Sequence, residues 1–182
     1  MDITVIDNAL DNNVLKACIN EAETQKSYYC MHPGGDGTYG FKYNWTFRAI
    51  NRPESFTNEP MIALWKEVKK HLPENAELFR GYVNAHQFGV EDNLHSDDPL
   101  FDNGYTVIVY LTSTWQASWG GQTMFYDNFT QEDNEIVRSV LPRYNRMVIF
   151  DKNLPHAVAP LSKRFTGVRF TCMFKVKIDE PA

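Results

Sequence analysis

From about residue 78 onward the chain alternates short apolar runs with turn residues, and this pattern constrains the fold more than any other feature. Many short strands separated by turns are typical of a β-sandwich or jelly roll. The candidate strands are 79–88, 93–97, 105–112, 121–127, 146–151 and 168–176. The separating turn residues are Gly89, Asn103-Gly104, Gly120-Gly121, Asn128, Pro142 and Gly167.

The N-terminal part has a different pattern, with two amphipathic helices. A short strand at 3–6 precedes a helix at about 12–24, which Asp11 can cap. A strand at 42–50 precedes a second helix at about 60–71, with Pro60 in its first turn. Each helix has one apolar face, so both are expected to cover a sheet. The predicted fold class is mainly β with flanking helices (α+β), in a single domain over residues 1–182.

Composition excludes several classes of protein. The formal net charge of -5 argues against a broad nucleic-acid-binding face, which would normally be basic. No apolar run is long enough to span a membrane, and the first residues lack the pattern of a signal peptide. The three cysteines include no C-x-x-C pair, which argues against a zinc site and favours reduced thiols. We therefore expect a cytoplasmic protein.

The segment 93–97 places an imidazole, His95, two residues before a carboxylate, Asp97. If the segment is extended, side chains alternate and both groups point to one face. His156, which follows Pro155, is the candidate for a third ligand. Two imidazoles and one carboxylate, with other positions open, form the facial triad of non-haem Fe(II) oxygenases. A solvated loop is the alternative interpretation of the His95–Asp97 pair taken alone.

Two other carboxylates lie close to these residues in the sequence. Asp98 competes with Asp97, but alternation puts only Asp97 on the face of His95. Asp98 is therefore expected to cap the turn at Pro99. Asp151 either supports His156 from outside the ligand set or is a surface-turn carboxylate, and both interpretations stay open.

Further motifs follow the His95–Asp97 pair in a specific order. They are a strand that carries Tyr110, the sequence GGQTMF at 120–125, Pro155-His156, and Arg169 near the start of the last strand. In this order they resemble the Fe(II)- and 2-oxoglutarate-dependent oxygenases, and within them the prolyl 4-hydroxylase-like branch. The similarity covers roughly residues 79–176, with a looser match of the N-terminal strand and helix.

The resemblance implies a double-stranded β-helix, a cupin-like jelly roll whose core is roughly 79–176, with the N-terminal helices packed on its major sheet. It implies His95, Asp97 and His156 as ligands of Fe(II). The cosubstrates would be 2-oxoglutarate and O2, with ascorbate as a stimulating reductant. The implied reaction hydroxylates a C–H bond while 2-oxoglutarate is converted to succinate and CO2.

The resemblance also implies residues that bind 2-oxoglutarate. Arg169 and Thr171 share one face of the last strand and suit the distal carboxylate. Tyr110 lies where the family often has a phenol. His86 replaces a tyrosine of collagen-type relatives, and either binds the cosubstrate or is a core histidine. Arg169 lies thirteen residues after His156, a longer spacing than is usual in the family, so Arg164 is a rival.

The substrate is less well defined by the sequence. Trp115 and Trp119 either stack on a substrate or only pack their loop. The Gly-rich loop 31–40 is a candidate lid, and its His32 is expected to be exposed. A prolyl residue in a peptide or protein is the substrate that the branch implies. The alternatives are a nucleobase or small-molecule oxygenase and a non-enzymatic jelly-roll binding module. Nothing in the sequence indicates the oligomeric state.

Overall fold

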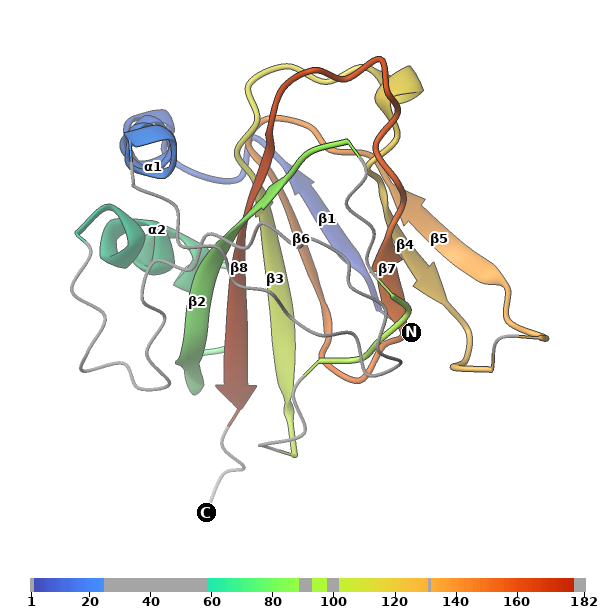
Figure 1. Cartoon of the computed structure of the whole chain (residues 1–182). Coiled ribbons are helices and arrows are strands. Elements are labelled where there is room, and N and C mark those ends of the chain that lie inside the picture. The colour runs from blue at the N-terminus through green and yellow to red at the C-terminus, as the bar shows by residue number, and fades with distance from the viewer. Residues whose placement is uncertain (1, 25–58, 89–92, 98–101, 131, 179–182) are drawn as a thin grey trace.

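The computed structural model describes residues 2–24, 59–88, 93–97, 102–130 and 132–178 (Figure 1). Eight strands in two antiparallel sheets, two α-helices and a 3₁₀ turn make up this part of the chain. In chain order they are β1 (Thr4–Asp7), α1 (Asn12–Thr24), α2 (Glu59–Lys69), β2 (Ala76–His86), β3 (Gly104–Tyr110), η2 (Ala117–Trp119), β4 (Thr123–Tyr126), β5 (Ile136–Val140), β6 (Arg146–Asp151), β7 (His156–Val158) and β8 (Arg169–Ile178).

The larger sheet has the strand order β1-β6-β3-β8-β2, and the smaller sheet has the order β5-β4-β7. In the larger sheet β3 lies between β6 and β8, and it pairs in register with both. Strands that are neighbours in space are therefore often distant in sequence. This arrangement of two antiparallel sheets agrees with the double-stranded β-helix that the sequence predicts.

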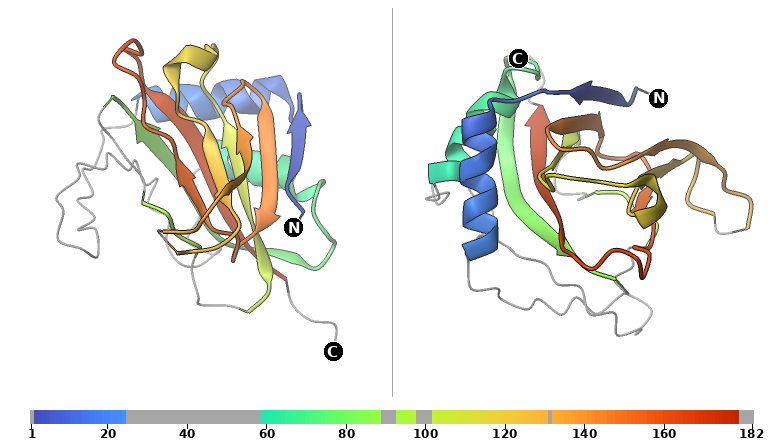
Figure 2. Two further views of the ribbon diagram at one scale, coloured as in Figure 1. Left: turned by 90° about the vertical axis from the view of Figure 1, so that its right-hand side faces the viewer. Right: turned by 90° about the horizontal axis from the view of Figure 1, so that it is seen from above.

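The two faces of the larger sheet have different partners because side chains alternate along each strand. On the outer face, residues such as Phe170, Cys172 and Phe174 pack with Leu15 and Leu64 of the two helices. Figure 2 shows both helices on this outer side and the smaller sheet on the other. On the inner face a second core joins both sheets through Ile108, Tyr110, Phe125, Val140, Val148, Phe150, Leu154 and Met173. Arg169, Thr171 and Lys175 share this inner face of β8 with Met173.

Both predicted helices are present. Asp11 caps α1 as expected, because its Oδ1 accepts hydrogen bonds from the backbone N–H groups of Asn13 and Val14 at 2.8 and 3.1 Å. The α2 helix begins at Glu59 and ends at Lys69, two residues earlier than predicted, and it buries Met61. None of the helices in the described part of the chain has the length and apolar character needed to span a bilayer.

The structure also corrects some strand predictions. The segment 93–97 is not a strand and forms only an isolated bridge between His95 and His156. Two strands, β5 and β7, were not predicted. Most of β5 is exposed on both faces, so it lacks apolar alternation, and β7 has only three residues. The predicted strand at 42–50 and the candidate lid at 31–40, with His32, lie outside the described residues.

Candidate active site

Three ligand-type side chains converge on the inner side of the barrel. His95 and His156 face each other across their bridge, where each backbone N–H donates to the other's carbonyl at 3.0 and 2.9 Å. One ligand atom from each of His95, Asp97 and His156 can be chosen so that all three lie within 4.8 Å of one another. Within the described residues, no other set of three or more His, Cys, Asp or Glu side chains lies close enough together to hold a metal ion. Their donor set, two imidazoles and a carboxylate, fits Fe(II).

The two imidazoles are oriented by backbone carbonyls. Nδ1 of His156 lies 2.8 Å from the Leu154 carbonyl, and Nδ1 of His95 lies 2.7 Å from the Asn93 carbonyl. A carbonyl can only accept, so each Nδ1 carries the proton and each Nε2 has its lone pair available for a metal. The Nε2 atoms of His95 and His156 lie 3.9 and 3.7 Å from Asp97 oxygens. Burial lowers the pKa of His156 to about 4, which keeps its imidazole neutral at pH 7.

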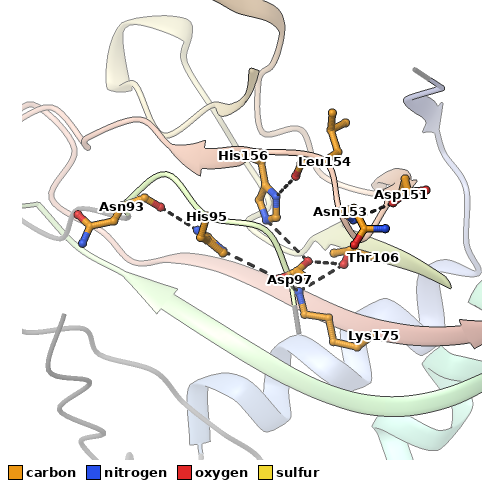
Figure 3. A network of polar contacts seen from close by, with 9 residues as sticks. All are labelled: Asn93, His95, Asp97, Thr106, Asp151, Asn153, Leu154, His156 and Lys175. Carbon is orange, nitrogen blue, oxygen red and sulfur yellow. Dashed lines mark hydrogen bonds and ion pairs between the residues drawn. The ribbon is translucent and has the colours of Figure 1, made fainter. Parts of the chain in front are cut away.

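The Asp97 carboxylate is held by two residues of the larger sheet (Figure 3). Thr106 on β3 donates a hydrogen bond to Oδ2, and the Lys175 ammonium on β8 forms an ion pair with Oδ1. Burial by itself would raise the pKa of Asp97, but Lys175 and the other neighbouring donors together lower the pKa below its usual value. The carboxylate is therefore ionised at neutral pH, as a metal ligand must be.

A second polar group lies further along the same inner face. Arg169 begins β8, is 1% exposed and pairs in register with His86 on β2. One guanidinium nitrogen of Arg169 lies 3.3 Å from Nδ1 of His86, and Cζ lies 5.3 Å from the ring centre of Tyr110. The phenolic oxygen of Tyr110 lies 2.7 Å from Oγ1 of Thr123 on the facing sheet. These side chains form a buried group of donors inside the barrel.

The spacing between the two polar groups follows from strand register. Phe125 on β4 pairs with His156, and Thr123 is two residues away on the same strand. Two residues of a strand span roughly 7 Å. Thr123, which the phenol of Tyr110 contacts, therefore lies one such two-residue step along β4 from the level of His156. Thr171 is buried on the same face, paired in register with Tyr110.

The glycine pair at 120–121 lies at the Arg169 end of the barrel, where Gly121 borders the Arg169 stem. Both glycines have positive φ, +73° and +68°, a region that favours glycine. A Cβ on Gly121 would lie 2.7 Å from Leu161, 2.9 Å from Trp115 and 3.2 Å from Cδ of Arg169. Glycine is needed here because a side chain would collide with Leu161 and Trp115 and would also crowd the Arg169 stem.

Arg164 and Asp151 take no part in the two polar groups. Arg164 is exposed and lines a separate surface pocket with Thr112 and Trp119. Asp151 is exposed, and its Oδ1 accepts the backbone N–H of Asn153 at 2.7 Å, so it is the surface-turn carboxylate. Asp98 lies outside the described residues.

The loop tryptophans pack on one another and on one phenylalanine. The ring centres of Trp115 and Trp119 are 5.5 Å apart, and both contact Phe165, at 4.8 and 5.0 Å. Nε1 of Trp115 donates to the Gly120 carbonyl at 3.1 Å. These contacts favour the loop-packing interpretation. Trp115 lies at the Arg169 end of the barrel, because Trp115 and Arg169 would both contact a side chain on Gly121.

Sequence reasoning missed Lys175 and Thr106 as parts of the site. The signal was available, because Lys175 continues the alternation of Arg169, Thr171 and Met173, and Thr106 shares the parity of Tyr110. A lysine at an inward-facing position of a long strand requires a partner.

Comparison with known proteins identifies the family of this chain. The family model of the 2OG-Fe(II) oxygenase superfamily matches residues 81–174. A prolyl 3-hydroxylase from Xenopus laevis is 30% identical over 129 residues, which is 66% of this chain but 24% of that protein. The chain therefore spans about a quarter of the length of this curated relative.

Two solved structures share the fold. A Trichoplax adhaerens prolyl hydroxylase, in complex with a peptide fragment of the oxygen degradation domain of hypoxia inducible factor, has a TM-score of 0.66 at 17% identity, over 97% of this chain and 83% of that one. A Pseudomonas putida prolyl-4-hydroxylase has a TM-score of 0.63 at 17% identity, over 98% and 93%. The chain belongs to the 2OG-Fe(II) oxygenase superfamily.

Proposed function

We propose that this protein is a dioxygenase of the prolyl 4-hydroxylase-like branch, which holds Fe(II) on His95, Asp97 and His156 and hydroxylates a prolyl residue in a peptide or protein. The observation that carries the proposal is the convergence of these three side chains. They lie about two residues along β4 from the buried group formed by Arg169 and Tyr110. With Fe(II), 2-oxoglutarate and O2 bound, such a site inserts one oxygen atom into a C–H bond and forms succinate and CO2. Ascorbate is proposed as a stimulating reductant.

We assign the distal carboxylate of 2-oxoglutarate to Arg169 and Tyr110. A guanidinium offers two parallel N–H donors to a carboxylate, and burial strengthens this charge-assisted pairing. His86 is placed to position the guanidinium of Arg169, and Thr171 is a further hydroxyl on the same inner face. The exposed Arg164 has no such setting, which makes it a poor anchor for a cosubstrate inside the barrel.

The direction of substrate approach is supported by the exposure of the three proposed ligands. The side chain of His95 is 41% exposed, whereas those of Asp97 and His156 are 7% and 4% exposed. The His95 side of the centre is therefore the side open to a bulky group. A proline ring on a peptide suits this approach better than a free metabolite, which would be enclosed on all sides.

Mass spectrometry of candidate peptides tests the substrate class. Incubation with Fe(II), 2-oxoglutarate and O2 is expected to add the mass of one oxygen atom to a proline-containing peptide and to release an equal amount of succinate. The matched control is the same peptide with alanine in place of proline, which should stay unmodified. If only free amino acids, nucleobases or other small molecules support succinate release, the peptidyl-proline assignment is wrong and the oxygenase assignment still stands.

The extent and location of the protein are also proposals. We infer one oxygenase domain over residues 1–182, with the barrel core at roughly 79–176. A cytoplasmic location is inferred from the expected reduced cysteines, and Cys18 and Cys172 are free and buried in the described part of the chain.

A further inference from the structure

Lys175 is a buried cation that the proposed reaction does not use. Only 4% of the residue is exposed. A lysine is rarely buried unless an anion compensates its charge. Its Nζ pairs with Oδ1 of Asp97, lies 3.4 Å from Oγ1 of Thr106, and lies 5.8 Å from the ring centre of Tyr82. The ammonium is therefore enclosed by the larger sheet and directed at the carboxylate.

The position of the ammonium relative to the two imidazoles decides what it can do. Figure 3 shows Asp97 between the histidines on one side and Lys175 with Thr106 on the other. Lys175 and Thr106 are paired across β8 and β3, so their side chains reach the carboxylate from the same part of the sheet. Both side chains donate to Asp97 from the side away from the two histidines, but only Lys175 carries a charge.

The charge has opposite effects in the two states of the site. Without a metal, Asp97 is a buried anion, and the nearby ammonium offsets the cost of removing it from water. With a divalent metal on the other side of the carboxylate, the metal neutralises the anion and the ammonium becomes a second cation close to the first. Like charges in a poorly solvated interior repel strongly, so the same ammonium then opposes metal binding.

We propose that Lys175 is the resident counter-ion of Asp97, a positioning residue that stabilises the metal-free barrel and weakens its hold on a divalent metal. The inference rests on the proposed metal site. It predicts that removal of the ammonium makes metal binding tighter, whereas removal of an ordinary orienting hydrogen bond makes metal binding weaker. Thr106, which donates to the other oxygen of Asp97, supplies that uncharged comparison.

Calorimetric titration of the metal-free protein with Mn(II) separates the two effects. Lys175→Met, which keeps the length of the side chain, is expected to lower the Kd for Mn(II) about tenfold or more, which is 1.4 kcal/mol or more. Thr106→Val is expected to raise this Kd. An unchanged Kd in Lys175→Met, or a rise in both variants, would overturn the inference. If folded wild-type protein binds neither Mn(II) nor anaerobic Fe(II), the proposed metal site itself is refuted.

Thermal unfolding without metal gives a second measurement that needs no turnover. Lys175→Met should melt below the wild type because it leaves a buried carboxylate without its cation. The double variant Asp97→Asn/Lys175→Met removes both charges and is expected to melt above Lys175→Met, although it has one more substitution. The counter-ion role is also supported if Lys175→Met does not fold and the double variant does. A double variant that melts no higher than Lys175→Met contradicts the counter-ion role.

Discussion

Replacement of His156 by alanine is expected to abolish Fe(II)-dependent succinate formation. His156 supplies the most buried of the three proposed ligands, and its Nδ1 proton is already held by the Leu154 carbonyl. Loss of a residue that only supports a metal ligand costs roughly 10–100-fold in metal affinity or activity, so loss of a ligand should cost more than about 100-fold. Succinate release per minute, with and without added Fe(II), is the measurement.

A matched control for this substitution is His71→Ala. His71 is exposed at the end of α2, and its ring nitrogen lies 3.0 Å from the Ala9 carbonyl, away from the proposed centre. We expect wild-type turnover in this variant. Circular dichroism should show that both proteins are folded. Wild-type turnover in a folded His156→Ala protein would refute the assignment of the metal ligands.

The second large effect separates the two arginines. Arg169→Ala is expected to raise the concentration of 2-oxoglutarate required for half-maximal turnover by about tenfold to a hundredfold. A hydrogen bond to a charged group contributes roughly 1.5–3 kcal/mol, which corresponds to about one to two decades in affinity. Arg164→Ala should change this requirement little, because an exposed guanidinium is solvated. The measurement is succinate release as a function of 2-oxoglutarate concentration at saturating Fe(II).

Arg169→Lys refines the same test, since it retains the positive charge and loses the planar fork. We expect an intermediate requirement for 2-oxoglutarate in this variant. A large loss in Arg164→Ala together with no loss in Arg169→Ala would mean that the cosubstrate binds outside the barrel, near the surface pocket that Arg164 lines.

The sequence was sufficient for the strands that carry most of the inner core. The predicted strand at 146–151 has the observed bounds of β6. The predicted alternation along β8 is also confirmed. Met173 packs in the inner core, whereas Phe170 and Cys172 pack in the outer core, so Arg169 and Thr171 share the face of Met173. Period-2 patterns are reliable where one face of a strand meets helices and the other meets a second sheet.

The parts that were missed lack such a pattern or depend on contacts across the chain. The alternation used to pair His95 with Asp97 assumed a strand, yet the segment forms only a bridge to His156. Asp97 turns toward the imidazoles because Lys175 and Thr106 hold its carboxylate, and these residues are distant in sequence. No signal around residue 97 itself indicates them, although alternation along the two distant strands puts both side chains on the inner face.

The packing around Gly121 gives the protein an internal optical probe. The indole of Trp115 and the stem of Arg169 border the same small space. Indole emission responds to nearby charge and to the loss of water, and an anion on the guanidinium changes both. Of the four tryptophans in the chain, we therefore expect Trp115 to change its emission when an anion occupies this end of the barrel, in protein that carries no label and is not turning over.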